Sequence, residues 1–386
     1  MLRSLYSGIS GLRSHQTMLD VTGNNIANVN TAGFKSSAVQ FEDTLSQLLK
    51  GGNAGTDTAG GSNPAQVGLG VQVAGISTNF AQGASQATGR PGDMLISGEG
   101  FFAVKSGAET LYTRAGSFDF DDNGVLVTPT GGLVQGWPAA NGVVNAGGAL
   151  TNISLPRDAV SPAVATTTAS IGGNLPDDAA AGTVLVRDIK VYDANGALTT
   201  VPLTFTKTAT GWNAGDGTTV AGAMTFTDGK LTSATTLTVG GVTLDLSKVT
   251  GFAQLTTVAV GTQNGREAGT LKSYTIESDG TITGAFSNGA TEALGRIALA
   301  TFTNASGLEK TGGSTYRATT ASGAATLGSP SDPGLGGLAV GYLEMSNVDL
   351  SQEFTNLIVA QRGFQANARI ITTSDEVLQE LTNLKR

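Results

Sequence analysis

The two ends of the chain carry the most regular pattern of apolar residues in the sequence. Each end repeats an apolar or small residue at helical spacing, which places those side chains along one face of a helix. Gln16 and Gly23 interrupt the first pattern, and Gln361 and Asp375 interrupt the second. The pattern predicts an amphipathic helix at each end. We expect the two faces to form a self-assembly interface that comprises Leu2, Leu5, Ile9, Leu12, Leu19, Ile26, Leu350, Phe354, Leu357, Phe364, Ile371 and Leu378.

Such helices need a packing partner, because isolated helices are marginally stable in water. Either the two ends pair with each other on one chain, or they bury their apolar faces against neighbouring copies. The second arrangement is favoured, because the rest of the chain has alternating strands that form cores of their own. Gly-rich connectors at 51–61 and 329–341 also allow the helices to stand away from that body.

Between the ends, the pattern changes to the alternation that is typical of β-strands. Asp122-Asn123-Gly124 and Asn195-Gly196 are hairpin turn sequences between apolar runs. From about 159 to 264 the composition shifts to Thr, Ala and Gly, which indicates a second β unit, a sandwich or a small barrel. The predicted fold class is therefore mainly β with terminal α-helices, and with one β domain inserted into another.

This order predicts four nested parts, in keeping with a chain of 386 residues that is long for a single core. After Phe34 we expect a short helix or an extended arm, and the stretch 51–63 has the composition of a flexible loop. The predicted parts are a terminal helical coiled-coil layer (1–28 and 350–386), a linker or arm (29–66 and 336–349), an inner β domain (67–158 and 265–335) and an inserted outer β domain (159–264).

Composition excludes several classes of function. The chain has 22 basic and 30 acidic residues, a net charge of −8, so it lacks the basic surface that binds nucleic acid or an anionic membrane. It has no cysteine, which excludes disulfides and thiolate chemistry. No apolar run is long enough for a membrane helix, and the N-terminus does not have the pattern of a cleaved signal peptide. If the protein is secreted, we expect another route.

Motifs that suggest chemistry have simpler structural interpretations. The run from Asp119 to Gly124 matches the opening of a calcium-binding EF-hand loop, but Thr130 stands where a bidentate Glu is needed, so we interpret it as a hairpin turn. The run from Gly98 to Ala103 fits a dinucleotide fingerprint but leads into a strand instead of a helix.

His15 is the only histidine, and it lies beside the apolar face of the first helix. It has no second histidine or cysteine with which to bind a metal, so we interpret it as structural. We therefore expect no enzyme activity and no catalytic, cofactor or metal site. A multi-β module that binds a carbohydrate or another ligand remains a rival outside the structural class.

Several motifs, taken in order along the chain, resemble those of bacterial flagellar rod and hook proteins. Gly100-Phe101-Phe102 and the run from Tyr112 to Phe118 resemble marks of this family in its β domain. The matching residues at the two ends are Asn24, Asn25, Ala27, Asn28, Gly33, Phe34, Lys35, Asn347, Val348, Gln361 and Arg362. The large insertion at 159–264 is similar to that of hook subunits, whereas the longer 51–63 loop keeps the distal rod protein as the alternative.

The resemblance implies a structural subunit. It implies a helical homo-polymer, a curved hollow tube that acts as a flexible universal joint between rod and filament. It further implies an extracellular place in the flagellum and export through the type III apparatus. Implied partners are the distal rod protein, the hook cap and the hook–filament junction protein. Phe41 and Leu45 resemble the short apolar motif that the export gate recognises.

Overall fold

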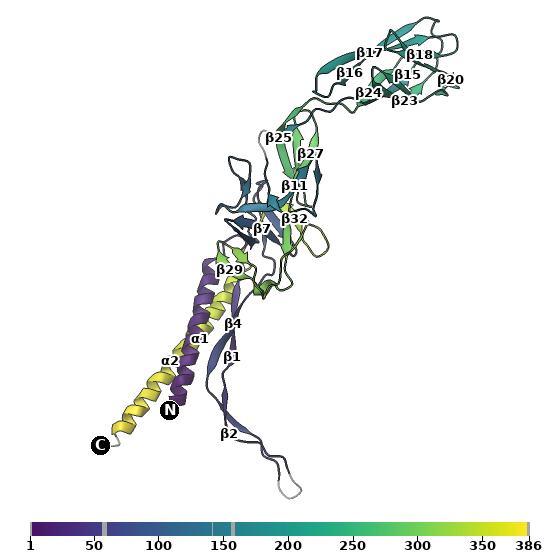
Figure 1. The fold of residues 1–386 in the computed structure, drawn as a ribbon. Helices are drawn as coiled ribbons and strands as arrows, with labels where there is room; N and C mark the ends of the chain where they lie inside the picture. Colours follow the sequence, from purple (N-terminus) through teal and green to yellow (C-terminus); the bar gives the residue numbers. More distant parts are fainter. Residues whose placement is uncertain (1, 56–59, 141, 156–158, 384–386) are drawn as a thin grey trace. The chain divides into compact units, whose positions relative to one another are not determined.

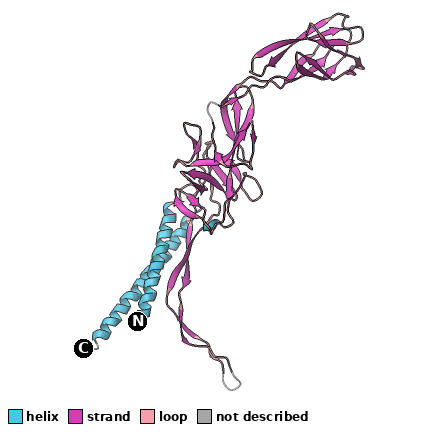
Figure 2. Cartoon of the chain, in the orientation of Figure 1, coloured by secondary structure: helices cyan, strands magenta, loops and turns pink. Residues whose placement is uncertain are grey.

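The computed structural model describes residues 2–55, 60–140, 142–155 and 159–383. One helix stands at each end of the chain, and strands make up most of what lies between them (Figure 2). This confirms the predicted fold class. The chain forms two compact units, which we call the helix-bearing unit (Met1–Leu155, Thr275–Ile282 and Ala293–Arg386) and the inserted unit (Pro156–Tyr274 and Thr283–Glu292).

In the helix-bearing unit, α1 (Leu2–Ala27) and α2 (Leu350–Asn383) lie side by side (Figure 1). Asp349 caps α2, because its Oδ1 accepts hydrogen bonds from the backbone N–H groups of Ser351 (2.8 Å) and Gln352 (3.2 Å). After α1 the chain turns through Gly33 at φ 68°. A Cβ there would come within 2.5 Å of the Ala115 backbone nitrogen, so both the conformation and the space require glycine.

The two helices contact each other through small and polar residues. A Cβ added to Gly8 would meet Ile371, one on Gly11 would meet Asn367, and one on Gly363 would meet His15. These contacts run in opposite directions along the two helices, so the pair is antiparallel. The side chains or glycines that are most deeply buried on the two helices are Gly8, Gly11, Ser14, Thr22, Asn25, Glu353 and Ala360.

Burial of the apolar faces against other copies stays a prediction, but α1 and α2 already pair with each other within one chain. The physical reason lies in residues that an apolar pattern does not include. Glycines and short polar side chains let helix backbones approach closely, and here they lie next to the apolar positions in the sequence. The apolar positions whose side chains the structure describes flank this contact and are at most half-buried by it.

An extended arm follows the first helix. β1 (Ser37–Asp43) pairs antiparallel with β4 (Val71–Thr78), and β2 (Ser46–Lys50) pairs with β3 (Ala65–Gly68). The segment after Phe34 is therefore extended and not helical, and the strand 71–78, predicted for the inner β domain, pairs on the arm instead. Within the predicted 51–63 loop, Asn53 and Ser62 form a β-bridge. Residues 56–59 of that loop lie outside the described residues.

The β part of the helix-bearing unit centres on the strand order β27-β11-β7-β8-β30-β29. Its core packs aromatic rings edge to face; Phe80 and Phe101, for example, are 5.4 Å apart between ring centres. The remaining strands and the 3₁₀-helix here are β5 (Ser85–Ala87), β6 (Met94–Ser97), β7 (Phe101–Ser106), β8 (Glu109–Thr113), β9 (Asp119–Phe120), β10 (Leu126–Val127), β11 (Leu133–Ala140), β12 (Val143–Val144), β13 (Thr151–Asn152), β27 (Thr291–Ile297), β28 (Leu299–Thr301), η1 (Ala305–Gly307), β29 (Glu309–Gly312), β30 (Thr315–Arg317), β31 (Thr326–Gly328), β32 (Gly337–Val340) and β33 (Tyr342–Glu344).

The inserted unit contains two sheets that share one core, a β-sandwich. A six-stranded sheet has the order β20-β21-β23-β15-β24 with β22 on β23, and a four-stranded sheet has the order β16-β17-β18-β19. Ile171 and Leu244 from the first sheet and Phe205 and Trp212 from the second are buried between them. The strands of these two sheets are β15 (Thr168–Asn174), β16 (Val184–Tyr192), β17 (Leu198–Lys207), β18 (Trp212–Gly215), β19 (Val220–Met224), β20 (Phe226–Thr227), β21 (Lys230–Leu231), β22 (Thr236–Val239), β23 (Val242–Thr250) and β24 (Ala259–Gln263). Three further strands, β14 (Val160–Ser161), β25 (Gly269–Ile276) and β26 (Thr281–Phe286), lie outside the two sheets.

Both predicted hairpin turns are confirmed. β9 and β10 pair across the turn at Gly124, whose φ is 74°, and β16 and β17 pair across the turn at Gly196, whose φ is 83°. In the first turn the Asp121 carboxylate accepts a hydrogen bond from the Val125 backbone N–H (2.7 Å), so it serves the turn itself.

Candidate assembly interface

The predicted interface residues lie on the helix pair but not at its centre. Ile9, Leu350, Phe354 and Phe364 are exposed, and Phe354 keeps 52% of its surface. The side chain of Leu2 lies outside the described part of the structure. The half-buried members are Leu5, Leu12, Leu19, Ile26, Leu357, Ile371 and Leu378. The helix pair thus leaves much of this apolar surface uncovered.

The helices carry further exposed apolar side chains that the predicted faces omit. They belong to a second stripe of α2 and to the start of α1, and a wider apolar stripe in the periodicity analysis would have found them. They are Tyr6 (69% exposed), Ile358 (56%), Val359 (55%), Ile370 (42%), Val377 (50%) and Leu381 (47%). Large exposed apolar patches are typical of interaction sites in proteins.

Three charged side chains converge where the segments that lead from α1 and into α2 meet the β part of the helix-bearing unit. Lys35 Nζ lies 2.5 Å from Glu344 Oε1, and both side chains are fully buried. Arg114, 1% exposed, places Nη1 3.8 Å from Glu344 Oε2 and donates a hydrogen bond to the Gly98 carbonyl (2.8 Å). The Gly83 backbone N–H also donates to Glu344 Oε1 (2.9 Å). Glu344 is therefore the centre of this cluster.

Burial governs the ionisation of the cluster. Burial lowers the pKa of Lys35 from its ordinary value, whereas the Glu344 carboxylate raises it. Burial likewise lowers the pKa of Arg114, against the opposing effect of Glu344 and Glu99. Tyr316 lies nearby, and burial raises the pKa of its hydroxyl. In each case removal of the charged form from water is the largest effect.

Two further polar bridges join the same segments. Asn347 Oδ1 accepts a hydrogen bond from the Ser36 N–H (2.9 Å), and its Nδ2 donates to the carbonyls of Asn79 and Ala81. Asn25 Nδ2 donates both to the Ser37 carbonyl (2.8 Å) and to Glu353 Oε1 on α2 (3.0 Å).

We call the three bridges Lys35–Glu344, Ser36–Asn347 and Asn25–Glu353 the polar ladder. Asn25, Lys35 and Asn347 belong to the motif recognised in the sequence, whereas Glu344 and Glu353 were missed. A lone glutamate ahead of or inside a helix carries no signal in a single sequence. The structure thus brings the two ends of the motif together.

The other motif residues take different places. Phe34 lies beneath Lys310, whose Nζ is 5.1 Å from the ring centre. Val348 is half-buried, while Ala27, Gln361 and Arg362 are exposed. On the arm, the Phe41 ring packs 5.8 Å from His15, and Leu45 is 82% exposed.

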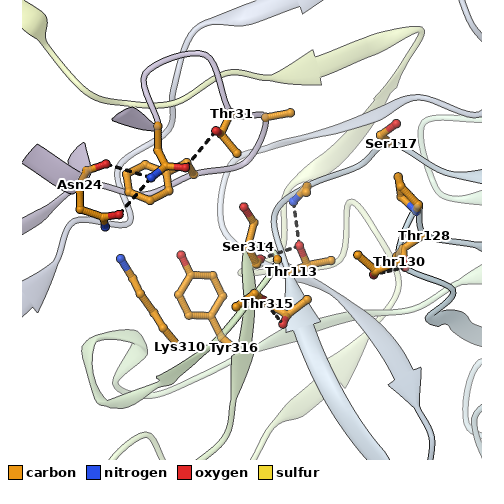
Figure 3. A pocket seen from close by; sticks show the side chains of 17 residues that line it. Asn24, Thr31, Thr113, Ser117, Thr128, Thr130, Lys310, Ser314, Thr315 and Tyr316 are labelled. Carbon is orange, nitrogen blue, oxygen red and sulfur yellow. Dashed lines mark hydrogen bonds between the residues drawn. The ribbon is translucent and has the colours of Figure 1, made fainter. Parts of the chain in front are cut away.

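A cavity of about 560 Å³ opens beside the end of α1 (Figure 3). Asn28 Nδ2 donates to Asn24, and the Thr31 hydroxyl donates to Asn28, so amides of the motif form one side. Across from them lie Lys310 and Tyr316 (Figure 3). The remaining lining consists mostly of hydroxyl, small and backbone groups.

Within the described residues, no group of three or more His, Cys, Asp or Glu side chains is placed to hold a metal ion. Across the same residues, none of the helices combines the length and the apolarity that crossing a membrane requires.

Comparison with known proteins shows that the chain belongs to the family of flagellar hook and rod proteins. Three family models match it: flagella basal body rod protein over residues 5–35, flagellar hook protein FlgE/F/G D1 domain over residues 95–168, and flagellar basal body rod FlgEFG protein C-terminal over residues 339–384.

Full-length relatives narrow the class to the hook. The chain is 39% identical to the flagellar hook protein FlgE of Borreliella burgdorferi, with all of both chains covered. It is 36% identical to FlgE of Escherichia coli, with 98% of each chain covered. It is also 36% identical to the flagellar basal-body rod protein FlgG of Bacillus subtilis, again over all of both chains. The hook assignment has the stronger support, with the rod as the lesser alternative.

Proposed function

We infer that the chain is a structural subunit that polymerises into the flagellar hook and acts without catalysis. One observation carries the inference: the helix pair uses small and polar residues for its internal contact and leaves Phe354, Ile358 and Val359 more than half exposed. Burial of apolar surface contributes about 25 cal/mol of favourable free energy per Å². In a homo-polymer, contacts between sister subunits would bury this surface.

The arm supports the same proposal. A two-stranded ribbon is marginally stable alone in water, yet Leu45, Leu48 and Leu49 on this one are 82%, 54% and 59% exposed. We propose that neighbouring subunits bury these side chains. Head-to-tail contacts that do not close into a ring generate a helical filament. We propose a hollow, curved tube with the terminal helices at its core.

The inserted sandwich suits a flexible joint. Its composition is rich in Thr, Gly and Ala, and its surface therefore offers few of the aromatic and arginine anchors that lock protein interfaces. We propose that such faces slide past one another as the tube bends, while the helical core keeps the tube continuous and transmits torque.

The remaining functional expectations follow from the family. We propose an extracellular position between the distal rod and the filament, with the rod protein, hook cap and hook–filament junction protein as partners. Export would use the flagellar type III apparatus. Phe41 and Leu45 are the proposed gate-recognition residues, in keeping with the exposure of both side chains.

Electron microscopy of purified, concentrated protein tests the proposal. Curved tubes are expected for a hook subunit, and straight tubes would favour the distal rod. A protein that stays monomeric at high concentration and binds carbohydrate or calcium would instead support a multi-β binding module.

A further inference from the structure

We propose that the polar ladder fixes the register in which α1 pairs with α2, and that Lys35 and Glu344 are its principal positioning residues. The inference goes beyond polymerisation, because it concerns the fold of a single chain. It determines which apolar side chains the helix pair presents outward, and with them the shape of the surface that other copies meet.

The helix contact itself specifies register weakly. Gly8, Gly11 and Ser14 on α1 recur at intervals of three, and Ala360 and Gly363 on α2 do the same. A slide of α2 by one turn would bring another stretch of α2 against these small residues of α1. Large interlocking side chains, which specify register in coiled coils, flank this contact instead of filling it.

The ladder specifies register strongly, because each of its three bridges joins one particular residue near α1 to one near α2. Besides the Lys35–Glu344 pair, the Gly33 N–H donates to the Glu344 carbonyl (2.7 Å). A slide of one turn would separate Asn25 from Glu353 and leave buried polar groups without partners. Unpaired buried groups are costly, so the alternative registers are disfavoured.

Energetics also favour a positioning role over a stabilising one. The cost of removing two charges from water roughly cancels their attraction, and register selection is the best-attested use of a buried polar pair. The charged groups that act on Lys35 are Glu344, Arg114 and Glu99, and Lys35 Nζ also donates to the Ala81 carbonyl (2.8 Å). Lys310 Nζ in turn donates to the Lys35 carbonyl (3.1 Å).

Engineered cysteine pairs can report the register, because the chain has no cysteine of its own. A Cβ on Gly8 would lie 3.4 Å from the Ile371 side chain, so Gly8→Cys with Ile371→Cys reports the observed register. Gly8→Cys with Ser374→Cys reports a register shifted by one turn. The yield of each disulfide is measured in the full chain at one fixed pH.

The ladder is tested by Lys35→Met with Glu344→Gln, which leaves the net charge unchanged. In the parent, the native-register disulfide is expected to exceed the shifted one by at least about tenfold, the ratio that one charge-assisted hydrogen bond alone would set. In the double variant the ratio is expected to fall, and the two remaining bridges are expected to keep it above one. The matched control, Arg317→Met with Glu109→Gln, removes an exposed ion pair of 2.6 Å and should keep the parent ratio.

Two outcomes overturn the proposal. If the Lys35→Met/Glu344→Gln protein folds and keeps the parent ratio, the pair does not determine register. If it fails to fold, the pair is needed for stability and not for positioning. Asn347→Ala with Glu353→Ala removes the other two bridges. In that protein the ratio of native-register to shifted-register disulfide is also expected to fall. Lys35→Arg, which keeps the charge, is expected to retain the parent ratio.

Discussion

Nζ of Lys35 lies 2.5 Å from Oε1 of Glu344, and the contact joins the segment after the first helix to the segment before the last one. Both side chains are fully buried. The two ends of the chain, 309 residues apart at this contact, are thereby held at one place on the β part of the helix-bearing unit. In the proposal above, this contact sets the register of the helix pair.

Loss of the Glu344 charge alone should destabilise the protein in a pH-dependent way. Glu344→Gln leaves the Lys35 cation buried without its carboxylate, which costs about 3–5 kcal/mol at neutral pH. The loss should be smaller when Lys35→Met is added. Unfolding by urea, followed by circular dichroism, measures both free energies. Equal losses in the single and double variants would contradict the coupling.

The direction of the pH effect follows from the pKa of Lys35. Burial already lowers this pKa from 10.5, and removal of Glu344 lowers it further. Between the folded pKa and 10.5 the unfolded chain binds more protons than the folded chain. The free energy of unfolding of Glu344→Gln should therefore rise as pH increases through this window. The Glu344→Gln/Lys35→Met protein lacks that group and should show no such rise.

Tyr316 should weaken the fold at alkaline pH. Burial raises the pKa of its hydroxyl above 10.0, so above pH 10 the unfolded chain loses this proton first and stability falls with rising pH. Tyr316→Phe should keep more of its pH 8 stability at pH 11 than the parent does. Tyr342→Phe, at a side chain that is 43% exposed, is the control. An unchanged alkaline profile in Tyr316→Phe would refute the assignment.

Two glycines should respond oppositely to alanine. In α2, a Cβ on Gly363 would come within 2.5 Å of the His15 ring, so Gly363→Ala should cost about 1–3 kcal/mol through overpacking. In α1, a Cβ on Gly23 meets no described heavy atom within 4 Å, so Gly23→Ala should stabilise by about 0.5–1 kcal/mol. Thermal unfolding measures both. Stabilisation by Gly363→Ala would show that the helices do not pair closely in solution.

Removal of residues 159–264 should separate assembly from flexibility. The helices, the arm and the polar ladder lie in the helix-bearing unit, so the shortened chain should still form tubes. Without the sandwich those tubes should be straight or altered in stiffness, as electron microscopy would reveal. A shortened chain whose helix-bearing unit is folded but does not assemble would contradict this division of roles.

Periodic features could be predicted from the sequence, whereas contacts between distant residues could not. Apolar spacing located both helices, and Gly124 and Gly196 located hairpins, because each signal is local. The helix contact was missed because Gly8 and Gly363 contribute through the absence of a side chain, which an apolar pattern does not count. Glu344 was missed because its role exists only when Lys35 and Arg114 are brought to it by the fold.

The central claim is that the outward apolar face of the helix pair joins sister subunits. Sedimentation velocity tests it most directly, by comparing Ile358→Asp with the parent and with Val143→Asp. Ile358 is 56% exposed on α2, and Val143 is 71% exposed on the β part of the same unit. We predict that Ile358→Asp stays a folded monomer at concentrations where the parent and Val143→Asp form tubes, because a buried, unpaired carboxylate is costly. Tubes of normal length from Ile358→Asp would contradict the claim.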